Sequence, residues 1–99
     1  MISSGLPFKY SLNQNFPNPF NNGTTITLAL PRNADVSLEI INILGQVVYK
    51  FKQSNYEAGI VRFDWNATDN SGQEVASGIY FYRVKVDNFV LTKKMMLLK

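Results

Sequence analysis

The last quarter of the chain, residues 77–99, constrains the fold most, because it reads as one long β-hairpin. Two runs of strand-forming residues are separated only by Asp87 and Asn88, which both tolerate the positive φ of a two-residue hairpin turn. Counting outward from that turn fixes the register. It predicts four facing pairs on one side of the hairpin: Val86 with Phe89, Val84 with Leu91, Tyr82 with Lys93, and Tyr80 with Met95. This side is mostly apolar, so we expect it to face a core, whereas the other side is mixed.

The rest of the chain repeats short alternating segments. Apolar and polar residues alternate over residues 24–30, 36–40, 47–52 and 61–65, and residues 74–76 could form a further short strand. Turn-forming residues separate these segments, a polar loop is expected over residues 53–59, and no window has a helical period. A chain of 99 residues is long enough for one domain with its own core. The sequence therefore predicts an all-β fold, an antiparallel immunoglobulin-like β-sandwich of about seven strands.

Aromatic residues mark the expected core. Trp65, Tyr80 and Tyr82 lie on core-facing positions, and the indole N–H of a buried Trp65 will need an acceptor. The segment NFPNPF places Phe16 and Phe20 around two prolines, which stiffen an extended, non-helical chain. We expect both phenylalanines to pack over the end of the core, in preference to forming a ligand-binding loop.

The composition removes most catalytic chemistry. The chain has no Cys and no His, so thiol and imidazole catalysis, disulfides and the usual zinc sites are excluded. No base is placed to activate a Ser or Thr, and we predict a protein that is not an enzyme, with no catalytic residue, cofactor or metal. One metal hypothesis stays open, a calcium site built from Asn66, Asp69, Asn70 and Glu74. We favour the simpler interpretation, in which Asp69 and Asn70 bond to the backbone of their own turn.

The basic residues are concentrated at the end of the chain. Residues 1–82 hold five basic and six acidic side chains, and residues 83–99 hold five basic and one acidic, which together give the net charge of +3. Five cations on two strand faces do not make the continuous groove that nucleic acids need, so lysines guarding an edge strand are the favoured interpretation. The longest apolar run has four residues, too few to span a membrane. Residues 1–9 are interpreted as a linker or cloning remnant.

Several motifs in order carry a family resemblance. They are LNQNFPNPFNNGTTI, LPRNADVSLEIINILGQVV, Ala58-Gly59, Trp65, Asp69, Gly72, SGIYFYR and KKMMLLK, and together they cover residues 10–99. In this order they resemble the C-terminal sorting domain of Type IX secretion substrates. Trp65-Asn66-Ala67 stands where that family commonly has Trp-Asp-Gly. The SGIYFYR end is also similar to the immunoglobulin-like domain of the flagellar hook-capping protein.

The resemblance implies a non-catalytic sorting module. Members of the family direct a fused upstream enzyme or adhesin through the periplasm and across the outer membrane. Its partners would be an outer-membrane translocon and a sortase-like surface protease, and its location would be secreted or at the cell surface. A carbohydrate-binding or spacer module of a secreted multidomain enzyme is the alternative, and Tyr10, Tyr56 and Phe81 are the aromatic residues that could form a binding row.

Within this interpretation, the last strand is the expected recognition element. A terminal strand can be captured by addition to its edge, where the backbone supplies affinity and the side chains supply choice. Met95 and Leu97 continue the core face, so the recognition residues are predicted to be Lys93, Lys94, Met96, Leu98 and Lys99.

Overall fold

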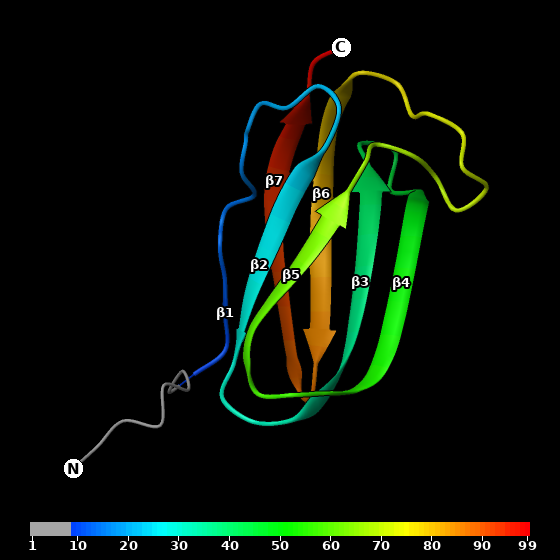
Figure 1. Ribbon diagram of the computed structural model, residues 1–99. Coiled ribbons are helices and arrows are strands. Elements are labelled where there is room, and N and C mark those ends of the chain that lie inside the picture. Colours follow the sequence, from blue (N-terminus) through cyan, green and yellow to red (C-terminus); the bar gives the residue numbers. More distant parts are fainter. Residues whose placement is uncertain (1–8) are drawn as a thin grey trace.

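Seven strands form two antiparallel sheets that pack face to face (Figure 1). The computed structural model describes residues 9–99, so the proposed linker at residues 1–9 lies outside the described residues except for Lys9. One sheet has the order β1-β2-β5 and the other β4-β3-β6-β7. The predicted all-β sandwich of about seven strands is confirmed. The strands are β1 (Ser11–Leu12), β2 (Thr24–Leu30), β3 (Ala34–Asn42), β4 (Val47–Tyr56), β5 (Gly59–Trp65), β6 (Gly78–Val86) and β7 (Phe89–Leu97).

The closing hairpin has the predicted register. Val86 faces Phe89, Tyr82 faces Lys93, and Tyr80 faces Met95 across β6 and β7, with Asp87 at the positive φ of 51° that the tight turn needs. The predicted core face is buried along β6, but on β7 only its C-terminal end is buried, at Met95 and Leu97. Phe89 at the turn is half exposed and packs on Tyr10, with ring centres 4.7 Å apart.

Strand boundaries were predicted well where alternation is clean. The strand β2 has its predicted bounds, whereas β4 continues to Tyr56 because its pairing with β3 extends to Ala34 and passes over a β-bulge. Half of the expected polar loop is therefore strand. The predicted strand at residues 74–76 is wrong: only one isolated bridge joins Thr68 and Glu74. The strand β1 has two residues and pairs with β2. The sequence did not predict it, because two residues are too few to show an alternating pattern.

An aromatic cluster around Trp65 fills the core at one end of the sandwich. Trp65 is 2% exposed and donates its indole N–H to the Thr68 carbonyl at 2.8 Å, which meets the predicted need for an acceptor. Phe20 and Tyr80 meet the indole edge-on, with ring centres 5.9 and 5.8 Å away. Tyr82 is also buried, in the middle of β6. The structure thus places Trp65, Phe20, Tyr80 and Tyr82 in the core.

Phe16 contradicts its predicted role, because its side chain is 79% exposed. Its backbone forms two hydrogen bonds with Thr25 at the edge of β2, which holds this part of the chain extended. Neighbouring side chains of an extended chain point in opposite directions. Asn15 takes the inward position and is 2% exposed, so Phe16 must point into solvent.

Candidate functional site

The predicted recognition residues lie in three different surroundings. Lys93 is on the core side of β7, opposite Tyr82 and partly buried. Lys94 and Met96 face outward, opposite Phe81 and Ile79 of β6. Leu98 and Lys99 follow the strand. The structure therefore groups Lys94 and Met96 on one surface and separates them from Lys93.

The backbone of β7 is the outer edge of the four-stranded sheet. In an antiparallel ladder, alternate residues turn their N–H and C=O groups toward the neighbouring strand. Counting from the two-residue turn, Leu91, Lys93 and Met95 point these groups at β6. The even positions from 90 to 98 point away from β6, toward whatever lies beyond the edge.

The chain's own N-terminal segment covers the C-terminal half of this edge. Figure 1 shows that segment, in blue, on the side of β7 away from β6. Four hydrogen bonds join the two. The Gln14 side-chain amide donates to the Lys94 carbonyl at 2.7 Å, and the side-chain Oδ1 of Asn18 accepts from the Met96 N–H at 2.9 Å. Phe20 N–H donates to the Met96 carbonyl at 3.0 Å, and the Phe20 carbonyl accepts from Leu98 N–H at 2.8 Å. We call residues 14–20 the edge cap.

Buried hydrogen bonds anchor the edge cap to the core. The Tyr82 hydroxyl accepts from Asn15 N–H and donates to the Asn13 carbonyl, both at 2.8 Å. The Asn15 amide donates to the Thr24 hydroxyl at 2.9 Å and to the Pro17 carbonyl at 3.1 Å. Burial raises the pKa of the Tyr82 hydroxyl, so it stays a donor at neutral pH. The Asn and Gln residues of this segment supply the amides that hold it.

At the opposite edge of the same sheet, a single side-chain amide bonds to one residue of β4. Asn70, in the loop between β5 and β6, accepts from Lys50 N–H at 2.8 Å and donates to the Lys50 carbonyl at 3.1 Å. The prediction that Asn70 bonds within its own turn is therefore wrong, because its side chain reaches β4. Asp69 does form the predicted turn: its Oδ1 accepts from Ser71 N–H, the Ser71 hydroxyl and Gln73 N–H at 2.6–3.0 Å. These bonds hold the pKa of Asp69 below its ordinary value.

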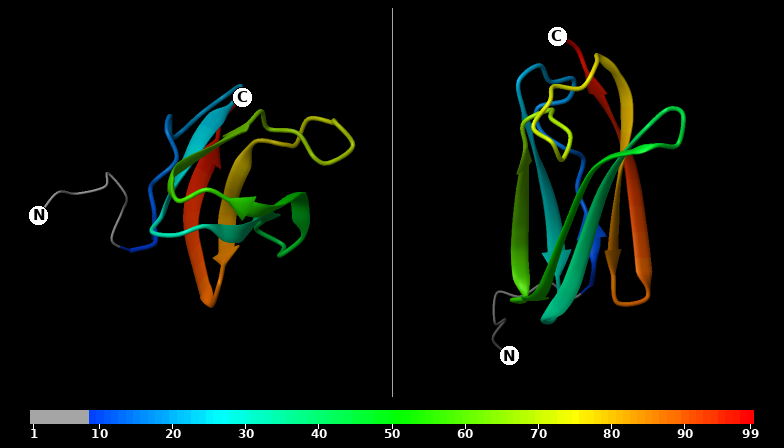
Figure 2. Two further views of the ribbon diagram at one scale, coloured as in Figure 1. Left: turned by 60° about the horizontal axis from the view of Figure 1, so that its bottom comes forward. Right: turned by 90° about the vertical axis from the view of Figure 1, so that its right-hand side faces the viewer.

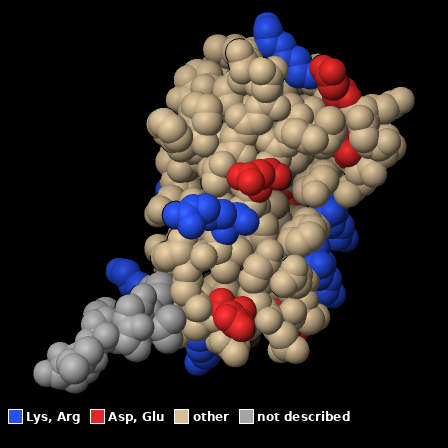
Figure 3. Space-filling model, in the orientation of Figure 1, with Lys and Arg blue, Asp and Glu red and all other residues tan. Residues whose placement is uncertain are grey.

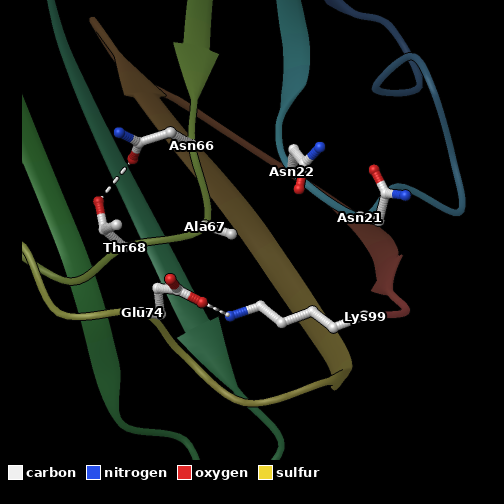
Figure 4. A pocket seen from close by; sticks show the side chains of 7 residues that line it. All are labelled: Asn21, Asn22, Asn66, Ala67, Thr68, Glu74 and Lys99. Carbon is white, nitrogen blue, oxygen red and sulfur yellow. Dashed lines mark hydrogen bonds and ion pairs between the residues drawn. The ribbon is translucent and has the colours of Figure 1, made fainter.

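A polar cavity of about 430 Å³ lies where the chain ends (Figure 4). Glu74 and Lys99 form an ion pair across it at 3.0 Å, a surface contact of small energetic value. Within residues 9–99, no group of three or more acidic, His or Cys residues could hold a metal ion. Ala67, one of the lining residues, has a φ of 62°. This left-handed conformation favours glycine, as in the common form of the Trp-Asn-Ala motif.

The outer face of the four-stranded sheet carries Lys94 and Met96. Its half near the β6–β7 turn is charged: Glu39 lies between Lys50 and Arg83 in the register. Arg83 bonds to the Glu39 carboxylate at 2.6 and 3.0 Å, which holds the pKa of Glu39 below its ordinary value. The half near the chain's end is apolar apart from Lys94, with Ile41 facing Val47 and Phe81, and Ile79 facing Met96.

The outer face of the three-stranded sheet differs. Figure 3 shows that side of the molecule, where a basic group lies between acidic ones on a mostly uncharged surface. The alternating polar residues of β2 and β5 face solvent here, with the Thr25 hydroxyl donating to Asp64 at 2.7 Å. The three aromatic residues that could have formed a carbohydrate-binding row do not share a surface. Tyr10 packs on Phe89 and Tyr56 on the core residue Phe63, while Phe81 is on the outer face of the four-stranded sheet.

The described part of the chain contains no helix that is long and apolar enough to cross a membrane.

Comparison with solved structures supports the fold. The chain is similar to dimeric latent PorU from Porphyromonas gingivalis, with a TM-score of 0.71 and 21% identity over 98% of the chain and 10% of PorU. It is similar to PorZ, a surface component of the type-IX secretion system of the same organism, with a TM-score of 0.57 and 23% identity over 91% of the chain and 11% of PorZ. FlgD from P. aeruginosa gives a TM-score of 0.62 and 21% identity, over 95% of the chain and 78% of FlgD.

The chain thus spans about a tenth of PorU and of PorZ. A search of curated protein sequences finds no match. A family model, the FlgD Ig-like domain, matches residues 14–88, which is more than half of the chain. The match begins with the edge cap and ends inside the β6–β7 turn, so it includes β2 to β6, with strands from both sheets, and leaves out β1 and β7. The chain therefore belongs to the family of FlgD Ig-like domains.

Proposed function

We propose that this domain is a non-catalytic sorting module, which directs a fused cargo protein across the bacterial outer membrane through the Type IX secretion system. The support is the ordered set of motifs from residue 10 to residue 99, together with structural similarity to parts of two P. gingivalis proteins, one of which is a component of that system. The partners are an outer-membrane translocon and a sortase-like surface protease. The cargo passes through the periplasm and ends secreted or at the cell surface.

One observation carries the choice of recognition element. In the C-terminal half of β7, the core-facing side chains Met95 and Leu97 are fully buried and the edge is covered by the edge cap. What this half still presents to a partner is the outward side chains of Lys94, Met96 and Leu98, each at least one-third exposed. A receptor that reads these side chains need not disturb the fold. Export and stability can therefore be separated by mutation.

The test fuses a fluorescent cargo to the N-terminal side of the chain in cells with an active Type IX system. Deleting Leu98 and Lys99, or replacing Lys93 and Lys94 with Ser, is expected to leave a folded domain and a cargo stranded in the periplasm. Trp65→Ala removes the centre of the aromatic cluster at a cost of about 3–5 kcal/mol and is expected to lose fold and export together.

Cell fractionation measures export, and circular dichroism of the same purified variants measures folding. Normal secretion by the folded tail variants would contradict the proposal. It would move recognition to another surface, with the loop of residues 66–78 as the first candidate.

A further inference from the structure

The apolar half of the outer face of the four-stranded sheet extends beyond the last strand. Four strands contribute to it: Ile41 from β3, Val47 from β4, Ile79 and Phe81 from β6, and Met96 from β7. Polar or charged residues normally occupy the solvent side of an antiparallel sheet. Here these five positions are apolar, with Lys94 at the end of the row that holds Ile41 and Phe81. Val47 and Met96 are 45% and 37% exposed.

The turn between β3 and β4 extends this apolar surface. Ile43 and Leu44 lie at its tip and are 70% and 78% exposed. The right-hand view of Figure 2 shows the turn, in green, projecting beyond the outer face of the four-stranded sheet. We call residues 43–44 the ledge. The ledge continues from Ile41 on one side and from Val47 on the other.

The ledge is held rigid although its side chains are exposed. The side-chain Oδ1 of Asn42 accepts from Leu44 N–H and Gln46 N–H at 3.0 Å, and its Nδ2 donates to the Gln46 side chain at 2.9 Å. Gly45 supplies the positive φ of 83° that closes the turn. Ordering large apolar side chains in water has no benefit for folding, so a contiguous exposed patch of this kind indicates an interaction surface.

Positive charge borders the patch on the side toward the β6–β7 turn. Lys94 faces Phe81, and Lys50 and Arg83 lie one row away on either side of Glu39. The next row adds Lys52 and Lys85 on either side of Ser37. Glu39, the only carboxylate in these two rows, pairs with Arg83 at 2.6 Å and lies 4.0 Å from Lys85, so the two rows hold four cations against one anion. An apolar centre with a cationic rim complements an apolar surface bordered by carboxylates.

We propose that the ledge and the apolar half of this face form one docking surface for a protein partner with an apolar, acid-rimmed patch. The inference rests on the proposed function, and it deepens it: the translocon component contacts Lys94 and Met96 together with Ile41, Val47 and the ledge. The ledge belongs to a segment far from the last strand in the sequence. The recognised element is therefore a folded surface, with the last strand as one part of it.

The test uses the cargo fusion and a double variant, Ile43→Ser with Leu44→Ser. Both side chains are exposed, so the fold should not change, and circular dichroism checks this. Secretion is expected to fall about tenfold, as for loss of apolar anchors at an interface. Ile60→Ser is the matched control, because Ile60 is 54% exposed on the other sheet, and it is expected to secrete normally. In the same way, Lys50→Glu should reduce secretion and Arg62→Glu should not.

A photo-crosslinking residue placed at Leu44 in secreting cells identifies the partner. We expect a cross-link to a translocon component from position 44 and none from position 60. Normal secretion by the ledge variant beside a stranded tail deletion would overturn this inference and leave the proposed function standing. Failure of the unaltered chain to export its cargo would overturn both. If the purified chain bound phosphatidylglycerol vesicles and the ledge variant did not, the face would be a lipid-binding surface. That result would overturn the proposal of a protein partner.

Discussion

The two halves of β7 are protected in opposite ways. Between Lys94 and Leu98, the core-facing side chains are buried and the outward backbone groups are bonded to the edge cap. Between Phe89 and Lys93, the side chains are exposed or partly buried, and none is fully buried. Within the described residues, no bond from another segment reaches the outward backbone groups of Val90 and Thr92.

This difference shows how a sheet edge can be closed without lysines. The sequence suggested that lysines guard the last strand against pairing with other chains. In the structure, the edge cap performs this role on the C-terminal half of β7, and Asn70 bonds to one residue of the β4 edge, Lys50. A partner that added a strand at residues 94–98 would first have to displace the edge cap. Lys94, which is exposed on the outward face, is the lysine of this half that a partner could contact by charge.

The largest expected effect tests burial. Leu97→Ala removes a fully buried side chain from the capped half and should lower the free energy of unfolding by about 2–5 kcal/mol. Leu91→Ala, on the same side of the strand in the open half, should cost roughly 1 kcal/mol because Leu91 is only partly buried. Urea unfolding followed by Trp65 fluorescence measures both. Equal losses would show that the two halves are packed alike.

A smaller effect tests the edge cap itself. Asn18→Ala removes the acceptor of the Met96 N–H and should lower the free energy of unfolding by about 1 kcal/mol. In the unaltered chain, the amides of Met96 and Leu98 should exchange with solvent much more slowly than those of Val90 and Thr92. Asn18→Ala should speed exchange at Met96. The control is Asn22→Ala, an exposed amide outside the edge cap, and fast exchange at Met96 in the unaltered chain would contradict the capped edge.

The smallest effect lies at the hairpin turn of the open half. Asp87 accepts a hydrogen bond from the Tyr10 hydroxyl and pairs with Arg32 at 3.2 Å, and these contacts lower the pKa of Asp87. A lowered pKa in the folded state gives stability that is present above the unfolded pKa of about 3.9 and is lost as the pH falls through the folded value. Asp87→Asn should therefore reduce Tm slightly at pH 6 and leave it unchanged near pH 2. An equal difference in Tm at both pH values would exclude the ionised carboxylate as the cause.

The sequence predicted those parts of the molecule that follow from a local period. A two-residue turn and alternating side chains are sufficient to give the β6–β7 register and the bounds of β2. Trp65 was predicted to need an acceptor, and Thr68 provides it. The Asn15 side chain points inward and the Phe16 side chain points outward because this segment pairs with Thr25 at the edge of β2, and no local pattern in the sequence predicts that pairing.

The candidate site was predicted less completely, for a related reason. Asn18 bonds to the backbone of Met96, and Asn70 bonds to the backbone of Lys50. Bonds from side-chain amides to distant backbone groups produce no repeating pattern in a sequence. The ledge could have been predicted from the sequence, because Ile43 and Leu44 stand in a turn closed by Gly45, where exposed apolar side chains do not stabilise the fold. Its place beside Met96 follows only from the order of strands in the sheet.

One measurement tests most directly whether export depends on the outward side chains of the capped half. Two folded variants of the cargo fusion are compared for the ratio of secreted to periplasmic cargo: Lys94→Ser with Met96→Ser, and Val90→Ser with Thr92→Ala. All four positions face outward on β7, so both variants should keep nearly the same stability. We expect the first variant to leave its cargo in the periplasm and the second to secrete normally. Normal secretion by the first with loss in the second would place recognition on the open edge and contradict the account.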